Sequence, residues 1–187
     1  VESFLTRRQF KSWVFGIYEP ELLGTARTLW ENQEFFATKT TLLVHADNWC
    51  HCDFGEFIEF HHAHRPVRTL ITMMTFRTPS PKECGIVKLD RDGVVQDFFE
   101  KVENPPGNLA NGAVYLLDPE VIDWIKDRPS MVDFSKEVLP HFLGQIATWE
   151  NTKIHRDIGT IESLLDAQED EKPVTCWPEI DDWLSAF

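Results

Sequence analysis

The 187-residue sequence lacks several features that would assign it to a common class of protein. Its longest apolar runs, residues 41–46 and 113–117, are far shorter than the roughly 20 residues of a membrane-spanning helix. It has four cysteines at irregular spacings, and the printed residues show no signal-peptide pattern, so we expect no disulfides. Only 18 Lys and Arg stand against 31 Asp and Glu, and no basic stripe could attract nucleic acid. We therefore expect a soluble, cytoplasmic protein that binds neither membranes nor nucleic acid.

The remaining composition is that of one folded domain. The sequence is 42% hydrophobic and 26% charged, which excludes disordered, collagen-like and coiled-coil proteins. Its length is enough for one buried core. We predict one domain over residues 1–170 and a peripheral C-terminal tail over residues 171–187, which is acidic and contains Trp177 and Trp183. Because the chain begins at Val1, in what reads as the end of a helix, we expect that further residues precede it.

Alternating strand and helix patterns predict an α/β fold in the first half of the chain. Strands are predicted at residues 11–18, 41–46 and 67–76, and helices at 26–36, capped by Thr25, and at 54–64, capped by Asp53. The nearly continuous apolar segment 41–46 is typical of a strand that is covered on both faces in a parallel sheet.

In the second half the pattern changes, and it predicts an inserted antiparallel β-hairpin. Segments 85–89 and 94–101 flank Asp90-Arg-Asp-Gly93, whose residues favour a hairpin turn. Further strands are predicted at 113–117 and 146–149, and further helices from Pro119, at 134–143 and after Thr160. The whole pattern predicts a Rossmann-like, mixed but mostly parallel sheet flanked by helices, with a small antiparallel β insertion. Ligands of such folds bind at the carboxyl ends of the parallel strands.

Two acidic residues are candidates for holding a metal ion. Asp47 follows the strand 41–46 directly, and Asp157 opens the segment Asp157-Ile-Gly-Thr160. Carboxylates from two strand ends suit Mg²⁺ that is bound jointly with substrate phosphates, because this ion takes few protein ligands. On spacing alone, an Asx-turn or a helix cap explains each acid equally well.

A second group of residues has the side-chain types of a zinc site. It comprises Cys50, Cys52, His61, His62 and His64. The two cysteines lack the two-residue gap of a zinc knuckle, and the three histidines point in several directions around one helix turn. We therefore interpret these residues as part of a loop and a solvated helix face. No Gly-x-Ser-x-Gly nucleophile motif is present in the sequence.

Seven short motifs follow one another along the chain. They are Leu23-Gly-Thr-Ala26, Ala46-Asp47, Gly85-Ile-Val87, Asp92-Gly93, Phe99-Glu-Lys101, Asn111-Gly-Ala-Val-Tyr115 and Asp157-Ile-Gly-Thr160. In order and approximate spacing they resemble the sugar-1-phosphate nucleotidyltransferases, especially the mannose-1-phosphate and heptose-1-phosphate guanylyltransferases. The resemblance implies transfer of a nucleoside monophosphate from a nucleoside triphosphate, with GTP favoured, to a sugar 1-phosphate, with release of pyrophosphate.

The resemblance also implies roles for individual residues. The residues implied to contact the nucleotide are Gly24, Thr25 and Ala26. Those implied to hold Mg²⁺ are Asp47 and Asp157. Those implied to bind the sugar phosphate are Gly85, Glu100, Lys101 and Asn111, with Lys101 neutralising the phosphate. Asp47, Lys101 and Asp157 would thus form the catalytic set.

The sequence also departs from the family pattern. The Gly-rich loop that cradles the triphosphate is not in the printed chain, and Ala46 stands where the family commonly has Gly. His155 and Arg156 stand where an aromatic residue often precedes the acid. We therefore expect a divergent branch, and we expect the printed chain not to turn over by itself. Two alternatives stay open, a non-catalytic sugar-nucleotide-binding or regulatory module and a nucleotide-sugar glycosyltransferase, and so does assembly into a homo-oligomer.

Overall fold

The computed structural model describes residues 2–36 and 38–171. Segment Leu23–Asp170 forms one compact unit and contains every residue predicted for the site, whereas residues 2–22 belong to a separate unit. Trp177 and Trp183, which the predicted tail contains, lie outside the described residues. None of the helices in the described ranges is long and apolar enough to cross a membrane.

The separate unit begins with a short helix, α1 (Glu2–Leu5). Phe10 is buried there, and its ring stacks on that of Phe4 with 4.9 Å between the ring centroids. The strand predicted at residues 11–18 is wrong, because residues 11–13 form turns and residues 14–18 have no regular structure. The prediction rested on aromatic and β-branched composition, but Trp13 and Phe15 are 61% and 73% exposed, and no other described segment pairs with them.

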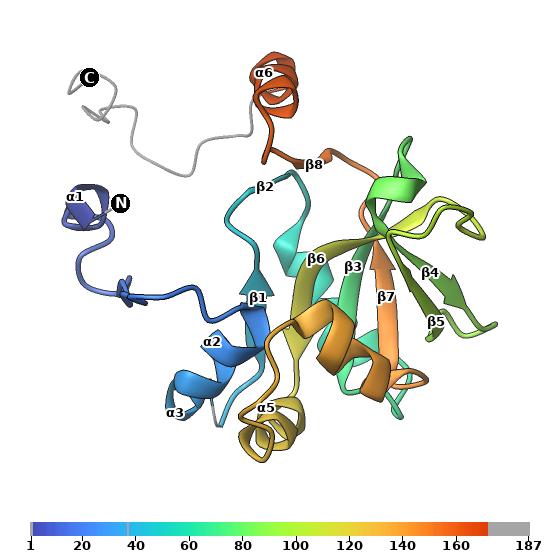
Figure 1. The fold of residues 1–187 in the computed structure, drawn as a ribbon, viewed down its shortest axis with the longest axis horizontal. Helices are drawn as coiled ribbons and strands as arrows, with labels where there is room; N and C mark the ends of the chain where they lie inside the picture. The colour runs from blue at the N-terminus through green and yellow to red at the C-terminus, as the bar shows by residue number, and fades with distance from the viewer. Residues whose placement is uncertain (1, 37, 172–187) are drawn as a thin grey trace. The chain divides into compact units, whose positions relative to one another are not determined.

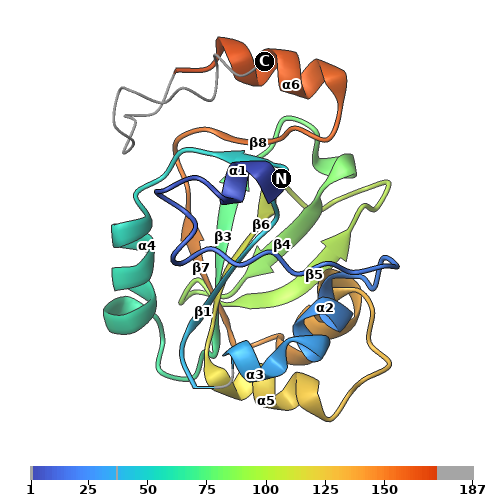
Figure 2. The same cartoon turned by 90° about the vertical axis from the view of Figure 1, so that its left-hand side faces the viewer.

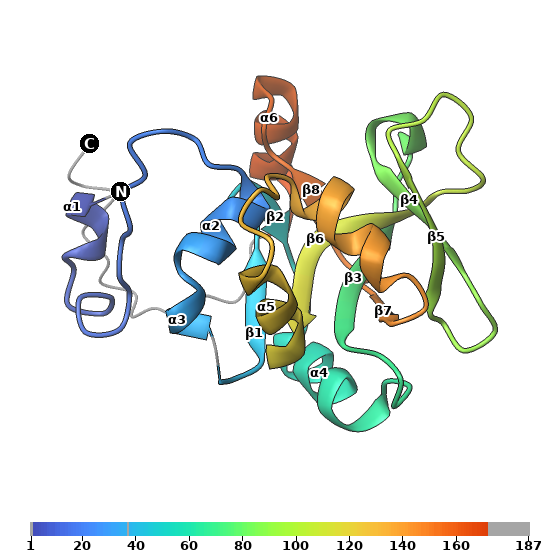
Figure 3. The same ribbon diagram turned by 60° about the horizontal axis from the view of Figure 1, so that its bottom comes forward.

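The main sheet has six strands in the order β5-β4-β6-β3-β7, with β1 also paired to β6 (Figure 1). The strands are β1 (Thr41–Val44), β3 (Ile71–Arg77), β4 (Gly85–Leu89), β5 (Val95–Glu100), β6 (Leu109–Leu117) and β7 (Ile146–Glu150). The predicted hairpin is confirmed as β4–β5, which lies away from β1 along the sheet (Figure 3). In the hairpin turn the Asp90 carboxylate accepts hydrogen bonds from the amides of Asp92 and Val94.

The mixed α/β sheet flanked by helices is confirmed, but the expected majority of parallel pairings is wrong. Among the described strands only β3 and β7 pair in parallel. The reason is that β6 runs antiparallel between β1 and β3, so that Leu117 faces both Thr41 and Ile71. The strand β1 is also less covered than predicted, since Leu42 and Val44 are 43% and 42% exposed.

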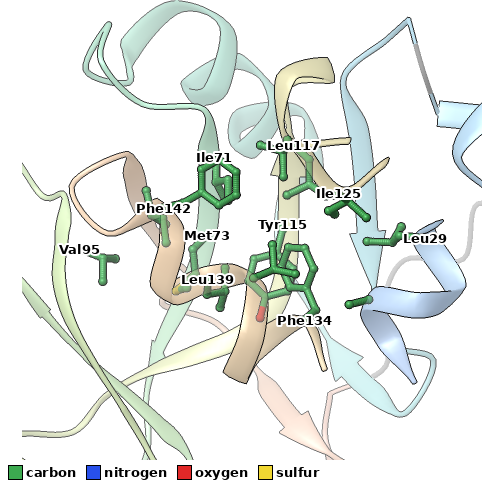
Figure 4. Packing of buried hydrophobic residues seen from close by; sticks show 14 of the residues in the cluster. Leu29, Ile71, Met73, Val95, Tyr115, Leu117, Ile125, Phe134, Leu139 and Phe142 are labelled. Carbon is green, nitrogen blue, oxygen red and sulfur yellow. The ribbon is translucent and has the colours of Figure 1, made fainter. Parts of the chain in front are cut away.

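Alternating side chains along β3 and β6 divide the core into two layers. One layer contains Ile71, Met73, Tyr115 and Leu117, and the other contains Met74, Val114 and Leu116. The first packs against α2 (Thr25–Glu31), α3 (Gln33–Phe36), α5 (Pro119–Lys126) and the turns η3 (Phe134–Val138) and η4 (Leu139–Phe142). The second is covered by α4 (Phe54–Glu59), on the other side of the sheet from α2 and α5 (Figure 2). In the first layer the rings of Tyr115 and Phe134 meet with 5.1 Å between centroids (Figure 4).

The histidines predicted on a solvated helix face divide between solvent and core. They lie in a π-helical turn, η1 (Phe60–His64), that continues α4. His62 and His64 are exposed, but the prediction is wrong for His61, whose side chain is fully buried. Its Nδ1 lies 2.8 Å from the Thr72 hydroxyl and its Nε2 lies 3.1 Å from the Asp118 carboxylate. These two partners satisfy the polar atoms of the ring, which is why burial is tolerated.

Candidate functional site

A small two-stranded sheet brings the two candidate metal acids together. Strand β2 (Asn48–Cys50) pairs antiparallel with β8 (His155–Asp157), and Asn48 faces Asp157 in this pairing. The Ile158 amide donates to the Asp47 carbonyl at 2.9 Å. Both acidic side chains are exposed. Figure 1 shows β2 and β8 next to each other at one end of the main sheet.

One open pocket collects six of the nine residues predicted for the site. These six are Asp47, Gly85, Glu100, Lys101, Asn111 and Asp157. They come from the ends of β4, β5 and β8, from β6 and from the link between β1 and β2. Segments far apart in the sequence therefore present carboxylate, amide and ammonium side chains to one cavity.

Gly85 allows the Glu100 carboxylate to lie across its strand. The two residues face each other in the β4–β5 pairing. A Cβ on Gly85 would lie 2.6 Å from Glu100 Oε2 and 2.6 Å from Phe98 Cζ, distances that no side chain could tolerate unless these groups moved. Burial raises the pKa of Glu100, although Lys101 opposes this shift. A carboxylate that has lost part of its hydration is well suited to accept hydrogen bonds from ligand hydroxyls.

Backbone strain is concentrated in the same pocket. Lys101 and Ala113 have φ angles of 50° and 51°, and they are the non-glycine residues with positive φ in the described part of the chain. Both line the pocket. Such conformations cost about 1–3 kcal/mol each and persist only where surrounding contacts enforce them. Here the Lys101 amide donates to the Cys84 carbonyl, and the Ala113 amide donates to Asn111 Oδ1 at 3.0 Å.

Asn111 is held in place by a buried tyrosine. Its Nδ2 donates to the Tyr115 hydroxyl at 2.7 Å, and its Oδ1 accepts from Ala113. Burial raises the pKa of Tyr115 to about 12, so the phenol stays protonated at neutral pH. An amide has two N–H groups and two acceptor positions on oxygen, so Asn111 keeps one of each for a ligand.

The three residues predicted to contact the nucleotide do not line this pocket. Gly24, with φ of 87°, is the N-cap of α2, so the prediction that Thr25 is the cap is wrong. The Thr25 hydroxyl instead accepts from the Phe134 amide at 2.9 Å. Ala26 is buried, and its amide donates to the Val132 carbonyl at 2.9 Å. These contacts attach α2 to the segment before η3, and a role in nucleotide binding stays a prediction.

The donor set of the pocket is compatible with Mg²⁺. Asp157 Oδ1 accepts from the Gly159 amide at 2.7 Å, which orients the carboxylate. Within residues 2–36 and 38–171 no group of three or more His, Cys, Asp or Glu side chains could hold a metal ion. An ion at Asp47 and Asp157 would therefore depend on water and ligand oxygens. Mg²⁺ commonly binds in this way, through one or two carboxylates and substrate phosphates.

Comparison with known proteins identifies the family. Residues 2–173 match the family described as Nucleotidyl transferase. The chain belongs to this nucleotidyl transferase family. A mannose-1-phosphate guanyltransferase of Candida albicans is 31% identical over 131 residues, which are 68% of this chain and 35% of that protein. The catalytic subunit beta of mannose-1-phosphate guanylyltransferase of Drosophila melanogaster is 27% identical over 79% of this chain and 40% of its own length.

Other members of the nucleotidyl transferase family carry other substrate names. A glucose-1-phosphate adenylyltransferase of Lachnospira eligens is 27% identical over 77% of this chain and 36% of that protein. The chain thus spans about 40% or less of the length of these curated relatives.

Solved structures confirm the Rossmann-like fold. A Bacillus anthracis structure, described as a glucose-1-phosphate thymidylyltransferase with sucrose, has a TM-score of 0.76 at 20% identity and covers 89% of this chain and 69% of its own. HddC from Yersinia pseudotuberculosis has a TM-score of 0.72 at 22% identity and covers 90% of this chain and 71% of its own.

Several other residues line the pocket, and two of them, Ser135 and His155, have polar side chains that were not singled out for it from the sequence. Ser135 lies in η3, and no local motif distinguishes it there. His155 lies two residues before Asp157 on β8. Because residues i and i+2 of a strand share a face, the position of Asp157 could have identified His155.

Proposed function

We propose that the protein, in its full-length form, transfers a nucleoside monophosphate from a nucleoside triphosphate to a sugar 1-phosphate and releases pyrophosphate. The observation that carries this proposal is the shared pocket of Asp47, Asp157, Glu100 and Lys101. Membership of the nucleotidyl transferase family supports it. The cytoplasmic location expected from the sequence stays a prediction.

The pocket residues suit the sugar-phosphate half of this reaction. In the proposed complex the Lys101 ammonium pairs with the sugar phosphate, and Glu100 accepts hydrogen bonds from sugar hydroxyls. Asn111 donates its remaining N–H to a sugar oxygen. A phosphate oxygen of the sugar 1-phosphate then attacks the α-phosphorus of the triphosphate, the bond to the β-phosphate breaks, and pyrophosphate leaves. The residues act mainly by positioning and charge neutralisation.

Asp47 and Asp157 would hold Mg²⁺ in the proposed complex. When bound, this ion supplies positive charge to the phosphate oxygens on which negative charge develops. The exposure of both carboxylates leaves room for the waters and phosphate oxygens that complete its coordination. The two acids would therefore bind the ion only weakly before substrate arrives.

Guanine and mannose or a heptose are the base and sugar that we propose first. The relatives named as mannose-1-phosphate guanylyltransferases motivate this choice. Relatives named for adenylyl and thymidylyl transfer to glucose 1-phosphate make a broad screen necessary. The assay measures pyrophosphate release by the full-length protein from GTP, ATP, dTTP, UTP and CTP with mannose, heptose and glucose 1-phosphates.

The decisive variant is Asp47→Asn, with Asp97→Asn as its control. Asp97 is an exposed carboxylate on β5 that does not line the pocket. We expect Asp47→Asn to lower Mg²⁺-dependent turnover at least a hundredfold and Asp97→Asn to leave it unchanged. Equal turnover of wild type and Asp47→Asn would overturn the metal assignment. Binding of a sugar nucleotide without any pyrophosphate release would instead favour a non-catalytic binding module.

A further inference from the structure

His155 has no role in the mechanism above, although its ring is fixed at the wall of the pocket. The ring packs on Phe76, another pocket residue, with 4.3 Å between centroids and 33° between planes. On the opposite strand of the β2–β8 ladder it faces Cys50. Its Nδ1 is buried and has no hydrogen bond of normal geometry in the described residues, although the pKa of the Cys50 thiol is lowered by hydrogen bonding to Cys52 and, to a smaller extent, to this imidazole.

The other edge of the His155 ring lies beside Gly112. A Cβ on Gly112 would lie 3.0 Å from His155 Cε1 and 3.3 Å from Nε2, so a side chain there would crowd the imidazole. The Met74 carbonyl, also 3.0 Å from that Cβ position, leaves no room to relax on the other side. Gly112 and His155 both line the pocket. The glycine therefore keeps space in which the imidazole edge can meet a ligand.

We infer that His155 is a further binding residue of the pocket and that its imidazole forms a hydrogen bond with a ring hydroxyl of the sugar 1-phosphate. This inference rests on the proposed function. A hydroxyl fits Nε2 better than a phosphate does, because it can donate or accept and so suits either tautomer of the ring. Lys101 already supplies a cation for the phosphate. His155 would thus determine which sugar the pocket accepts.

The test combines removal of the imidazole with removal of each hydroxyl. Calorimetry measures binding of mannose, glucose and heptose 1-phosphates to the full-length protein, and then of the 2-, 3-, 4- and 6-deoxy derivatives of the tightest binder. The variants are His155→Phe, which keeps an aromatic ring, and His155→Gln, which keeps a polar group. His64→Gln, at an exposed position outside the pocket, is the control. Thermal unfolding verifies that each variant is folded.

For the wild type we expect one deoxy derivative to bind roughly tenfold to a hundredfold more weakly than the parent sugar. His155→Phe should bind the parent sugar more weakly by a similar factor and should show no further loss with that derivative. His155→Gln should recover part of the affinity, and His64→Gln should match the wild type.

Two results would overturn the role of His155 without touching the proposed function. One is that His155→Phe binds the parent sugar 1-phosphate as tightly as the wild type does. The other is that His155→Phe loses as much affinity for each deoxy derivative as the wild type loses. Loss of inorganic phosphate binding in His155→Phe would assign the residue to the phosphate instead. If none of the three sugar 1-phosphates binds the wild type, the proposed function fails and this inference fails with it.

Discussion

Burial of His61 makes the stability of the fold sensitive to acid. The ring is fully buried between the Thr72 hydroxyl and the Asp118 carboxylate. The pKa of His61 is lowered from 6.5 to about 4, chiefly by burial and then by the nearby positive charge of Arg65. Asp118 acts in the opposite direction, but its attraction does not outweigh the loss of hydration. The folded protein therefore keeps this histidine neutral well below the pH at which the unfolded chain protonates it.

The size of the effect follows from the difference between the two pKa values. Above pH 6.5 neither state binds a proton at His61, so the residue has no effect on the pH dependence. Below that pH the unfolded state takes up a proton that the folded state refuses, and stability falls by about 1.4 kcal/mol per pH unit. The loss continues until the folded state also protonates near pH 4. The total is about 3 kcal/mol, a large share of the stability of a typical domain.

Urea unfolding of wild type and His61→Gln at pH 7, 6, 5 and 4 measures this contribution. His61→Gln should be less stable at pH 7, because Thr72 and Asp118 lose a buried partner. Its stability should fall less steeply with acid, and the difference between the two curves should approach 1.4 kcal/mol per pH unit. His64→Gln, at an exposed position, should follow the wild type. Parallel curves for wild type and His61→Gln would refute the reasoning.

Three further predictions concern Gly85, which lines the pocket, and two residues that adjoin pocket residues, Arg156 and Tyr115. Gly85→Ala should lower stability by about 1–3 kcal/mol in unfolding measurements and weaken sugar 1-phosphate binding in calorimetry. Gly107→Ala should change neither property, because a Cβ at Gly107 would have no atom within 4 Å. Arg156→Lys should lose the two-point contact with Asp170 and should be slightly less stable than the wild type in urea unfolding. Unchanged stability would show that solvent screens this pair. Tyr115→Phe should cost about 1–3 kcal/mol in thermal unfolding by leaving the pocket amide without its acceptor, and no cost would contradict that bond.

The sequence predicted best the elements whose signals are local. The hairpin turn at Asp90 to Gly93 and the start of α6 (Ile161–Glu169) after Thr160 are examples. In the structure Thr160 and Ser163 cap each other's backbone amides, which is a short-range contact. The strand predicted at residues 11–18 was wrong because a strand needs a partner, and composition does not supply one. Burial of His61 was likewise invisible, because its partners Thr72 and Asp118 come from other parts of the chain.

Within the candidate site, six of the nine predicted residues meet in one pocket, but the sequence did not predict the contacts that hold them. Glu100 was singled out by its motif, yet the need for Gly85 beneath its carboxylate appears only when the two strands pair. The same is true of Asn111, whose amide is oriented by the buried hydroxyl of Tyr115 four residues later. Such contacts depend on distances across strands, and spacing along one segment does not determine them.

The expected majority of parallel pairings was wrong, yet the two acids still follow strand ends at one edge of the sheet, and strand direction explains why. Both β1 and β3 run antiparallel to β6, so they share one direction, and β7 runs parallel to β3. The carboxyl ends of β1 and β7 therefore lie at the same edge of the sheet, although no parallel hydrogen bonds join them. Asp47 follows β1, and Asp157 lies on β8, the next strand after β7. The rule that ligands bind at this edge depends on strand direction, so an inserted antiparallel strand leaves it intact.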